Sequence, residues 1–370
     1  MVSVNMSQFR LRYVVPDLPS TDEVIPYLRR IDETNWYSNF GPMEQLFREE
    51  LAKLFFPGLN ARHIATACSG ALAIETALIA HGLAQGARVL MPSYTFVATA
   101  SAVVRAGYVP IFADIDLRTL ALDPAGAGHL ARILGCSAVV PVGVAGMSLP
   151  TAAWEDFAAE TGIAVIIDAA AGLGNQTISP LLTLAFSLHA TKPFGIGEGG
   201  LVVSAREEIV TRARVATNFG LDQGRGLFCG TNAKMSEYAA AVGLAQLKRS
   251  DAIMARRKPI LNAYRDALAA RVPEVRLLTP AESNPANLIV MLPQPRVREL
   301  VADLAAAGIE SRRLYVPPVH RHPAYLGYKC AEPMVNGERM STHSLSLPCH
   351  GAMTQADVDQ IVSLIANVLD

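Results

Sequence analysis

The chain has 370 residues, of which 51% are hydrophobic and 18% are charged, and its 32 basic side chains nearly balance 33 acidic ones. This length allows a large domain and a smaller one, each with a buried core, and the composition excludes a disordered chain. Because no basic run is present, the charge balance gives no field that would gather nucleic acid or an anionic membrane, so we expect neither as a partner.

The cysteines and the start of the chain bear on its compartment. Five cysteines are scattered without a C-x-x-C spacing, which argues against a disulfide framework and against a zinc site, and we expect no metal. The segment from Met1 to Val15 lacks the basic start and long apolar core of a signal peptide. No stretch approaches the ~18 uninterrupted apolar residues of a membrane span. We therefore expect a soluble, cytoplasmic protein.

The first two thirds of the chain read as alternating helices and strands. Two helices near 20–32 and 42–54 are separated by the turn-rich segment 36–42, and apolar strands then alternate with helices. The predicted strands are 63–67, 88–91, 109–113, 138–142, 164–167, 184–186 and 201–203, with helices at 70–81 and 95–106. Short apolar strands of this kind are typical of a covered sheet. The order predicts an α/β fold with a large, doubly wound, mostly parallel sheet.

The pattern changes in the last third of the chain. A glycine-rich loop leads to one long helix predicted over 236–268, and a smaller sheet follows. Its predicted strands are 275–278, 286–291 and 309–311, with helices at 297–307 and 354–369. We therefore divide the chain into a large domain, residues 1–250 with an N-terminal helical segment, and a smaller C-terminal α+β domain, residues 251–370.

An aspartate and a lysine follow two of the predicted strands. Asp168 ends the apolar run 163–167, where a carboxylate costs free energy unless it is paired, although a helix N-cap is the plainer interpretation. Lys192 lies in a loop of small residues ahead of Gly197-Glu198-Gly199-Gly200. A lysine amine can hold an aldehyde cofactor as a Schiff base while a carboxylate keeps the pyridine nitrogen of that cofactor protonated. The pair therefore predicts a pyridoxal phosphate site with Lys192 and Asp168 as its catalytic residues.

Four further places supply polar or aromatic groups to such a site. Ser69, Gly70 and Ala71 form a strand-to-helix turn whose free N–H groups suit a phosphate, although many such turns are plain helix caps. Phe96 follows a strand end, where its ring could stack on a planar cofactor or simply join the core. Ser187 could hold the phosphate, and Asn232 lies in a polar segment before the long helix. Each has a structural alternative, but their order and spacing favour one joint site.

This ordered set resembles the DegT/DnrJ/EryC1/StrS family of pyridoxal phosphate-dependent sugar aminotransferases, a branch of the fold type I enzymes. The resemblance covers nearly the whole chain, and its most specific part is the Lys192 run with the glycines after it. The other matching segments are 36–42, 69–78, 92–100, 114–116, 168–170, 230–237, 246–247 and 345–348.

The resemblance implies a homodimer with active sites shared between subunits. Lys192 would carry the cofactor, Asp168 would pair with its pyridine nitrogen and Phe96 would stack on its ring. Gly70, Ala71 and Ser187 would surround the phosphate, and Asn232 would reach the cofactor of the partner subunit. The implied reaction moves an amino group from glutamate or a similar donor to a keto acceptor, a nucleotide-linked keto sugar or a related cyclic ketone. The cofactor would alternate between pyridoxal 5'-phosphate and pyridoxamine 5'-phosphate.

The chain departs from the family pattern at several polar positions. Ala171 stands where the family usually has Gln or His, Ala71 replaces a threonine, and Lys234 replaces an arginine; Gly143 and Ala145 stand where a His and an aromatic residue are often found. Because of these losses, one alternative is a weakly active protein that binds cofactor or sugar nucleotide. Another alternative is sugar dehydratase chemistry on the same scaffold, but the family's dehydratases replace the lysine with His. Candidate acceptor surfaces are the loops 36–40, 219–228 and 315–325.

Overall fold

The computed structural model of the chain describes residues 9–280, 283 and 285–370. The first eight residues lie outside the described residues. They belong to the predicted large domain, and the expectation that the chain lacks a signal peptide concerns them as well. Two helices come first, α1 (Thr21–Thr34) and α2 (Pro42–Phe55), close to their predicted places. Ser20 and Glu23 bond reciprocally at the start of α1, a capping box, and Pro42 opens α2.

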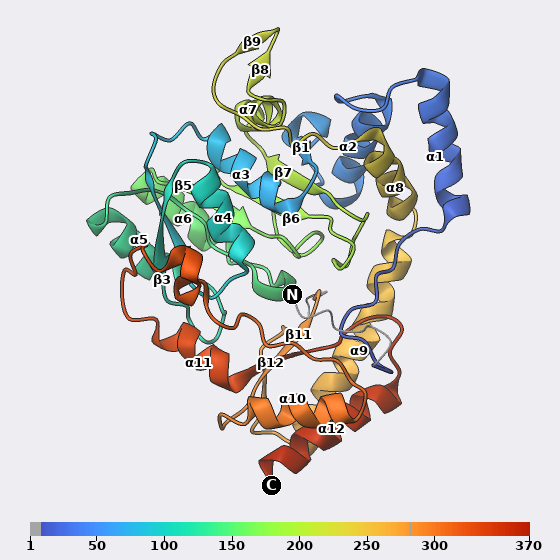
Figure 1. The fold of residues 1–370 in the computed structure, drawn as a ribbon, viewed down its shortest axis with the longest axis vertical. Helices are drawn as coiled ribbons and strands as arrows, with labels where there is room; N and C mark the ends of the chain where they lie inside the picture. Colours follow the sequence, from blue (N-terminus) through green and yellow to red (C-terminus); the bar gives the residue numbers. More distant parts are fainter. Residues whose placement is uncertain (1–8, 281–282, 284) are drawn as a thin grey trace.

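A seven-stranded sheet forms the centre of the upper part of the molecule (Figure 1), in the order β1-β7-β6-β5-β4-β2-β3. Only β7 runs antiparallel to its neighbours, β1 and β6, and the other strands are parallel. The α/β class with a mostly parallel sheet is thus confirmed. The strands are β1 (Ile64–Ala67), β2 (Arg88–Pro92), β3 (Val109–Ala113), β4 (Cys136–Val139), β5 (Ala164–Asp168), β6 (Thr183–Ser187) and β7 (Gly200–Ser204).

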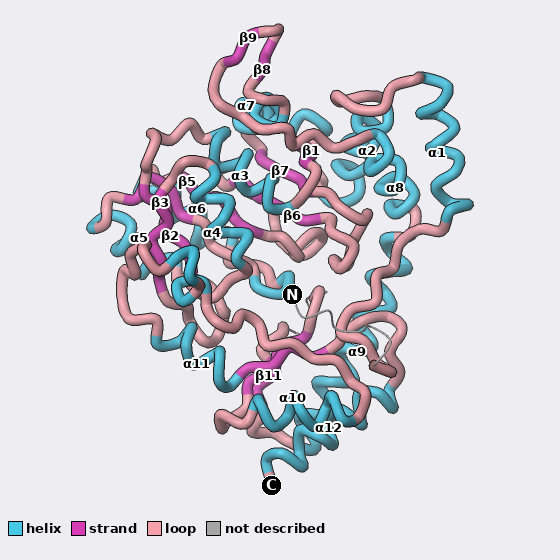
Figure 2. Tube along the Cα trace, viewed as in Figure 1, coloured by secondary structure: helices cyan, strands magenta, loops and turns pink. Residues whose placement is uncertain are grey.

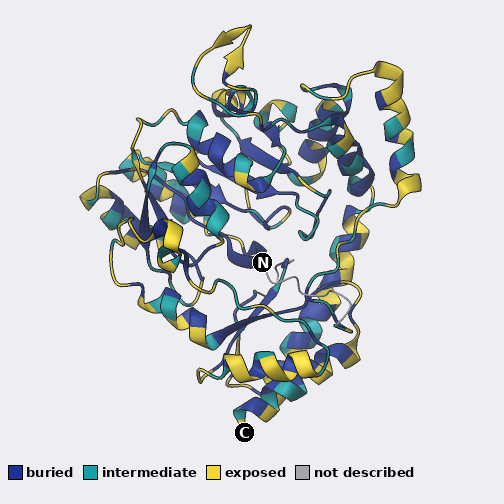
Figure 3. Cartoon of the chain, in the orientation of Figure 1, coloured by how far each residue is buried: buried dark blue, intermediate teal, exposed yellow. Residues whose placement is uncertain are grey.

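Helices cover both faces of this sheet, as Figure 2 shows. Side chains alternate along each strand, so Leu90 of β2 packs in one core cluster while Val89 and Met91 pack in the other. The first cluster includes residues of α1, α2, α5 (Pro124–Ile133), α6 (Thr151–Thr161) and α8 (Glu237–Leu247), and the second includes α3 (Gly70–Ala80), α4 (Val97–Arg105) and α7 (Glu207–Thr217). Figure 3 shows the resulting pattern of buried strands under partly exposed helices.

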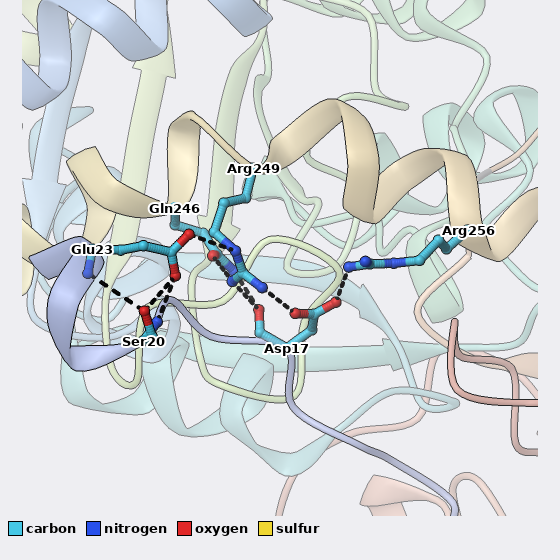
Figure 4. Close-up of polar contacts among 6 residues, drawn as sticks. All are labelled: Asp17, Ser20, Glu23, Gln246, Arg249 and Arg256. Atoms are coloured by element: carbon cyan, nitrogen blue, oxygen red, sulfur yellow. Dashed lines mark hydrogen bonds and ion pairs between the residues drawn. The ribbon is translucent and has the colours of Figure 1, made fainter.

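The prediction of one long helix over 236–268 is wrong. The chain forms α8 and then α9 (Ser250–Arg271), with a turn at Lys248 and Arg249 between them. No glycine or proline marks this turn, and tertiary contacts account for it: Arg249 Nη2 lies 2.7 Å from Asp17 Oδ1, and Gln246 donates to the Asp17 carbonyl at 2.6 Å (Figure 4). Arg256 of α9 binds the other oxygen of the same carboxylate at 2.5 Å. The N-terminal segment therefore holds the junction of the two helices.

The C-terminal part contains a three-stranded antiparallel sheet, β10 (Arg276–Leu277), β11 (Leu288–Met291) and β12 (Ser344–Leu347), in that order. It packs with α9, α10 (Val297–Ala306) and α12 (Gln355–Leu369) in a core cluster of its own. The predicted strand at 309–311 is wrong, because Ile309 makes only an isolated bridge to Leu11 of the N-terminal segment. The remaining elements are the hairpin β8 (Leu221–Asp222) and β9 (Arg225–Gly226), α11 (Val335–His343), and short 3-10 turns η1 (Ala61–His63), η2 (Val144–Gly146), η3 (Val319–Arg321) and η4 (Pro323–Tyr325).

Some residues pack across the predicted boundary at 250. Leu11 lies in the C-terminal core cluster, whereas Val319, Tyr325 and Met334 lie in a cluster of the large sheet. The division into residues 1–250 and 251–370 therefore stays a prediction. Among the described residues, no helix is both long enough and apolar enough to cross a membrane.

Candidate functional site

Asp168 is the last residue of β5 and is 4% exposed. Its carboxylate accepts two hydrogen bonds from within the chain, at Oδ2 from the Thr99 hydroxyl (2.8 Å) and at Oδ1 from the Ala170 N–H (3.1 Å). Burial raises the pKa of Asp168, while these two bonds and the charge of Lys192 act in the opposite direction. A buried acid costs free energy that packing alone does not return, so the arrangement indicates a functional position.

Lys192 lies in the loop after β6 and is partly buried. Burial lowers the pKa of its amine, and the nearby charge of Asp168 opposes that shift, so the structure brings the two predicted catalytic residues within electrostatic reach. In the described part of the chain, no ion pair within 4.0 Å joins them. A lowered pKa gives more neutral amine at a given pH, and the neutral amine is the form that attacks an aldehyde.

The start of α3 meets the ends of two strands at unusually close range. A Cβ atom on Gly70 would lie 2.5 Å from Cβ of Ser187, the last residue of β6. A Cβ atom on Gly200, the first residue of β7, would lie 2.3 Å from the carbonyl oxygen of Ser69. Only glycine allows both approaches. Ser69, Gly70 and Ser187 are thus brought together, as predicted from the sequence.

This place carries free donors at a helix start. Ser69 caps α3 by accepting the N–H of Leu72 at 3.3 Å, and the first intrahelical bond runs from Ala73 N–H to the Ser69 carbonyl. Among the described residues, no acceptor takes the N–H of Gly70 or of Ala71. Ala71 is exposed. Free N–H groups and the positive end of the helix dipole make such a start suited to a phosphate.

Phe96 precedes α4, and the residue is 61% exposed. Its centroid lies 6.5 Å from that of Tyr315, which in turn lies 5.3 Å from Tyr94. Three residues after Phe96, in the first turn of α4, Thr99 binds Asp168. Phe96 is therefore an exposed aromatic side chain next to the helical turn whose Thr99 bonds to the buried Asp168. The interpretation of Phe96 as a core residue is wrong.

Asn232 lies in the loop before α8 and is exposed. Its side-chain oxygen accepts from Lys234 Nζ at 2.8 Å, and Lys234 in turn lies over the Phe219 ring at 4.5 Å. The next residue, Ala233, accepts the N–H of Cys68 at 2.7 Å, which places this loop against the residue before Ser69. Within one chain, Asn232 thus contacts Lys234 rather than another predicted site residue.

Two residues near Asp168 were not singled out from the sequence. Thr99 lies four residues after Thr95, and such a pair on one helix face is a weak signal for a hydroxyl chain. Tyr315 comes from the C-terminal part, in the loop 315–325, and its proximity to Phe96 and Asp168 could be known only from the tertiary structure. In the same loop, His320 and Tyr325 bond to Glu338 and Ser101, so both have structural partners.

The sequence model of the DegT/DnrJ/EryC1/StrS aminotransferase family matches residues 20–366. The chain belongs to this family. The resemblance found in the sequence is thereby confirmed, and with it the enzyme class and the cofactor: the chain is a pyridoxal phosphate-dependent aminotransferase, working with pyridoxal and pyridoxamine 5'-phosphate.

Relatives of known sequence and structure agree with this assignment. The dTDP-4-amino-4,6-dideoxy-D-glucose transaminase of Shigella dysenteriae is 31% identical over 365 residues, which cover 95% of this chain and 97% of the relative. A putative PLP-dependent aminotransferase from Bacillus cereus ATCC 10987 has a structure with TM-score 0.89 and 28% identity, covering 96% and 99% of the two chains. The structure of DesI with its TDP-sugar product has TM-score 0.84 and 30% identity, covering 96% and 92%. The fold type I class is thus confirmed.

The residues of this aminotransferase fit its cofactor. Gly70 and Ala71 offer unpaired N–H groups at a helix start, as a phosphate requires. Asp168 and Lys192 are an acid and an amine that are close but not ion-paired. Phe96 adds an exposed aromatic side chain that lies beside the C-terminal Tyr315. The site thus provides an anion-binding turn, a carboxylate, an amine and an aromatic face.

Proposed function

We propose that this aminotransferase moves the amino group of glutamate or a similar donor to a nucleotide-linked keto sugar or a related cyclic ketone. The Asp168 and Lys192 arrangement carries the proposal, because a buried acid and a readily neutral amine are the two groups that amino transfer needs. The sugar acceptor is supported by the relatives, one of which is named for an amino-sugar transamination and one of which was solved with a TDP-sugar.

In this proposal each side chain has a defined task. When bound, pyridoxal phosphate supplies an aldehyde that exchanges amines and a pyridine ring that accepts an electron pair. Asp168 would hold a proton at the pyridine nitrogen by hydrogen bonding. Lys192 would anchor the cofactor, and its neutral Nζ would take up and return the substrate proton. Phe96 would offer its ring to one face of the cofactor.

The remaining proposed ligands hold the phosphate in place. Ser69 caps the helix start, Gly70 and Ala71 donate their N–H groups, and Ser187 contributes a hydroxyl from the end of β6. Ala71 carries no hydroxyl and Ala171 no polar side chain, so in this proposal the backbone N–H groups and the Ser187 hydroxyl bind the phosphate.

A spectroscopic assay with product analysis tests this function. Purified protein with added pyridoxal phosphate should show a visible absorbance band that borohydride bleaches, and glutamate should convert that band to the pyridoxamine form. A TDP- or GDP-linked 4-keto sugar should then restore the band and yield an amino sugar detectable by mass spectrometry. A band that glutamate and other amino acids leave unchanged would instead favour the protein that binds cofactor but does not turn over. Loss of water from the sugar without amine incorporation would favour the dehydratase.

We also propose a homodimer with shared active sites. Six large apolar side chains are 41–55% exposed, around the loop after α1, the β8–β9 hairpin and the start of α8: Trp36, Tyr37, Phe219, Leu221, Leu227 and Tyr238. Exposed apolar residues in such a group mark a protein interface. Asn232 lies between the hairpin and α8, so an interface here would carry it toward a partner subunit. The five cysteines, all free, support the cytoplasmic location that we propose.

Mixing two inactive variants tests the sharing of sites. Lys192→Ala lacks the amine in its own chain, and Asn232→Ala lacks the side chain expected in the partner's site. Each mixed dimer of the two variants would contain one site with both residues intact. Aminotransferase activity should therefore recover after the two variants are unfolded together and refolded. If activity does not recover, Asn232 belongs to the active site of its own chain.

A further inference from the structure

Two buried threonines lie behind the acid of the site. Thr99 is 1% exposed and Thr95 is 2% exposed, and their hydroxyl oxygens are 2.9 Å apart. Thr99 Oγ1 also lies 2.8 Å from Asp168 Oδ2. Since an ionised carboxylate only accepts hydrogen bonds, the Thr99 proton points to Asp168. The Thr99 oxygen must then accept from Thr95, so the chain of donors runs from Thr95 to Thr99 to Asp168.

The hydroxyl of Thr99 bonds differently from those of Thr76 and Thr161, which lie in other helices. Helical threonines commonly return their hydroxyl proton to a carbonyl of the preceding turn. Thr76 of α3 does so to Leu72 at 2.7 Å, and Thr161 of α6 does so to Phe157 at 2.7 Å. Thr99, in the first turn of α4, instead directs its proton to a carboxylate. Its hydroxyl is therefore engaged by the acid of the site rather than by its own helix.

The two threonines also belong to the turn that carries the exposed aromatic ring. Phe96 lies directly after Thr95, and its carbonyl accepts the N–H of Thr99 at 3.2 Å. A shift of this turn would therefore move Phe96 and release Asp168 together. The other oxygen of the acid is held by the Ala170 N–H, so Thr99 is the one side chain among the described residues that hydrogen-bonds to Asp168.

We propose that Thr99, oriented by Thr95, is a positioning residue of this aminotransferase that fixes the rotamer of Asp168 and keeps its negative charge toward the cofactor. The proposal rests on the role of Asp168 proposed above. Burial acts to protonate the acid, and a hydrogen bond donated to its charged form opposes this. A hydrogen bond to a charged group contributes about 1.5–3 kcal/mol, and tenfold in affinity corresponds to about 1.4 kcal/mol.

The test replaces the hydroxyl with a methyl group and measures cofactor affinity. Thr99→Val should weaken the binding of pyridoxal phosphate to the cofactor-free protein roughly ten- to hundredfold, measured by equilibrium titration, and Thr99→Ser should restore most of it. Thr95→Val should give a smaller loss, because it removes only the group that orients Thr99. Thr76→Val is the matched control: it removes a buried helix hydroxyl that does not reach Asp168, so it should leave the affinity unchanged.

The pH profile separates positioning from packing. Without the Thr99 bond the pKa of Asp168 rises further, so binding should be lost at a higher pH on acidification than in the wild type. The titratable groups that face Asp168 are Lys192 and Tyr315, and Thr99→Val alters neither. The Thr76→Val profile should match the wild type.

Two outcomes would overturn the inference. One is a Thr99→Val protein with wild-type affinity and pH profile, and the other is a loss no larger than that of Thr76→Val. If Thr99→Val does not fold, Thr95→Val decides, and an unchanged affinity in that variant counts against the hydroxyl chain. These outcomes presuppose a wild type that binds cofactor with a visible band; a wild type without that band contradicts the proposed function instead.

Discussion

The buried and exposed sides of the site are built in different ways. On the buried side, Asp168, Thr99 and Thr95 are each less than 5% exposed and joined by hydrogen bonds within the chain. On the exposed side, Phe96 has a largely uncovered ring and Asn232 bonds only to the neighbouring Lys234 among the described residues. The buried side is organised by the fold itself, whereas the exposed side offers groups that a ligand or a second chain would cover.

This difference between the two sides indicates which groups of the site are preorganised for the reaction. Groups fixed by internal bonds need no rearrangement when substrate arrives, and their electrostatic effect is strongest away from water. Exposed groups gain contact only on binding, and so they govern affinity and choice of partner. Substitutions on the buried side should therefore have large effects on turnover and cofactor affinity, and those on the exposed side should have smaller effects, confined to binding.

Replacing the amine of the buried side should have the largest effect. Lys192→Ala should lower turnover by a factor of about 10²–10⁴ or more, because it removes both the covalent anchor and the group that transfers the substrate proton. Its unfolding temperature should not fall, since burial disfavours the lysine charge. Lys53→Ala, on the surface beside Glu50, is the control and should keep full activity. Substantial turnover by Lys192→Ala would remove Lys192 from the mechanism.

The pH at which the cofactor attaches should show that Lys192 is partly buried. Because burial lowers the pKa of Lys192, its neutral amine forms below the ordinary lysine value of 10.5. Attachment of pyridoxal phosphate, trapped with borohydride and located by peptide mass, should therefore rise with pH and level off below 10.5. Lys53 is an internal control in the same sample, since a hydrogen bond and the charge of Glu50 hold its pKa above 10.5. A Lys192 profile that coincides with that of Lys53 would contradict this account of the buried side.

A methyl group in the helix-start turn should have an intermediate effect. Gly70→Ala would press on the Ser187 side chain at 2.5 Å, and overpacking of this kind costs about 1–3 kcal/mol of unfolding free energy. The displaced turn should also bind pyridoxal phosphate more weakly. Gly226→Ala is the matched control, because no atom lies within 4 Å of its added Cβ. Equal stability of the two variants, measured by urea unfolding, would show that α3 and β6 are not held at close range.

Local patterns predicted the part of the fold that depends on neighbours in sequence. The strand over 109–113 and the helices starting near Ser20 and Pro42 follow from apolar runs and capping residues, and the structure has them within two residues of the predicted ends. The break between α8 and α9 could not be predicted in this way, because Asp17, more than 200 residues away in sequence, provides the contacts that stabilise it.

The same distinction holds for the site. Asp168 ends β5 and the turn of Ser69, Gly70 and Ala71 follows β1, and parallel strands end at one edge of a sheet, so their place at a common edge was predictable. The contact of Tyr315 with Phe96 depends on how the C-terminal part packs against the large sheet, which no local pattern encodes. The bond from Thr99 to Asp168 likewise depends on the register between α4 and β5.

The smallest expected effect concerns the exposed side, and it is the sharpest test of the comparison. Phe96→Leu should change the free energy of unfolding by less than about 0.5 kcal/mol, because the residue is 61% exposed. It should weaken cofactor binding by a factor of about 2–13, which corresponds to the roughly 0.5–1.5 kcal/mol of an aromatic stacking contact. Phe112 is fully buried, so Phe112→Leu should have the opposite pattern: it should lower the free energy of unfolding by about 1 kcal/mol and change cofactor affinity little. If Phe96→Leu instead loses stability and keeps its affinity, the ring is a packing residue and the exposed side is not completed by the cofactor.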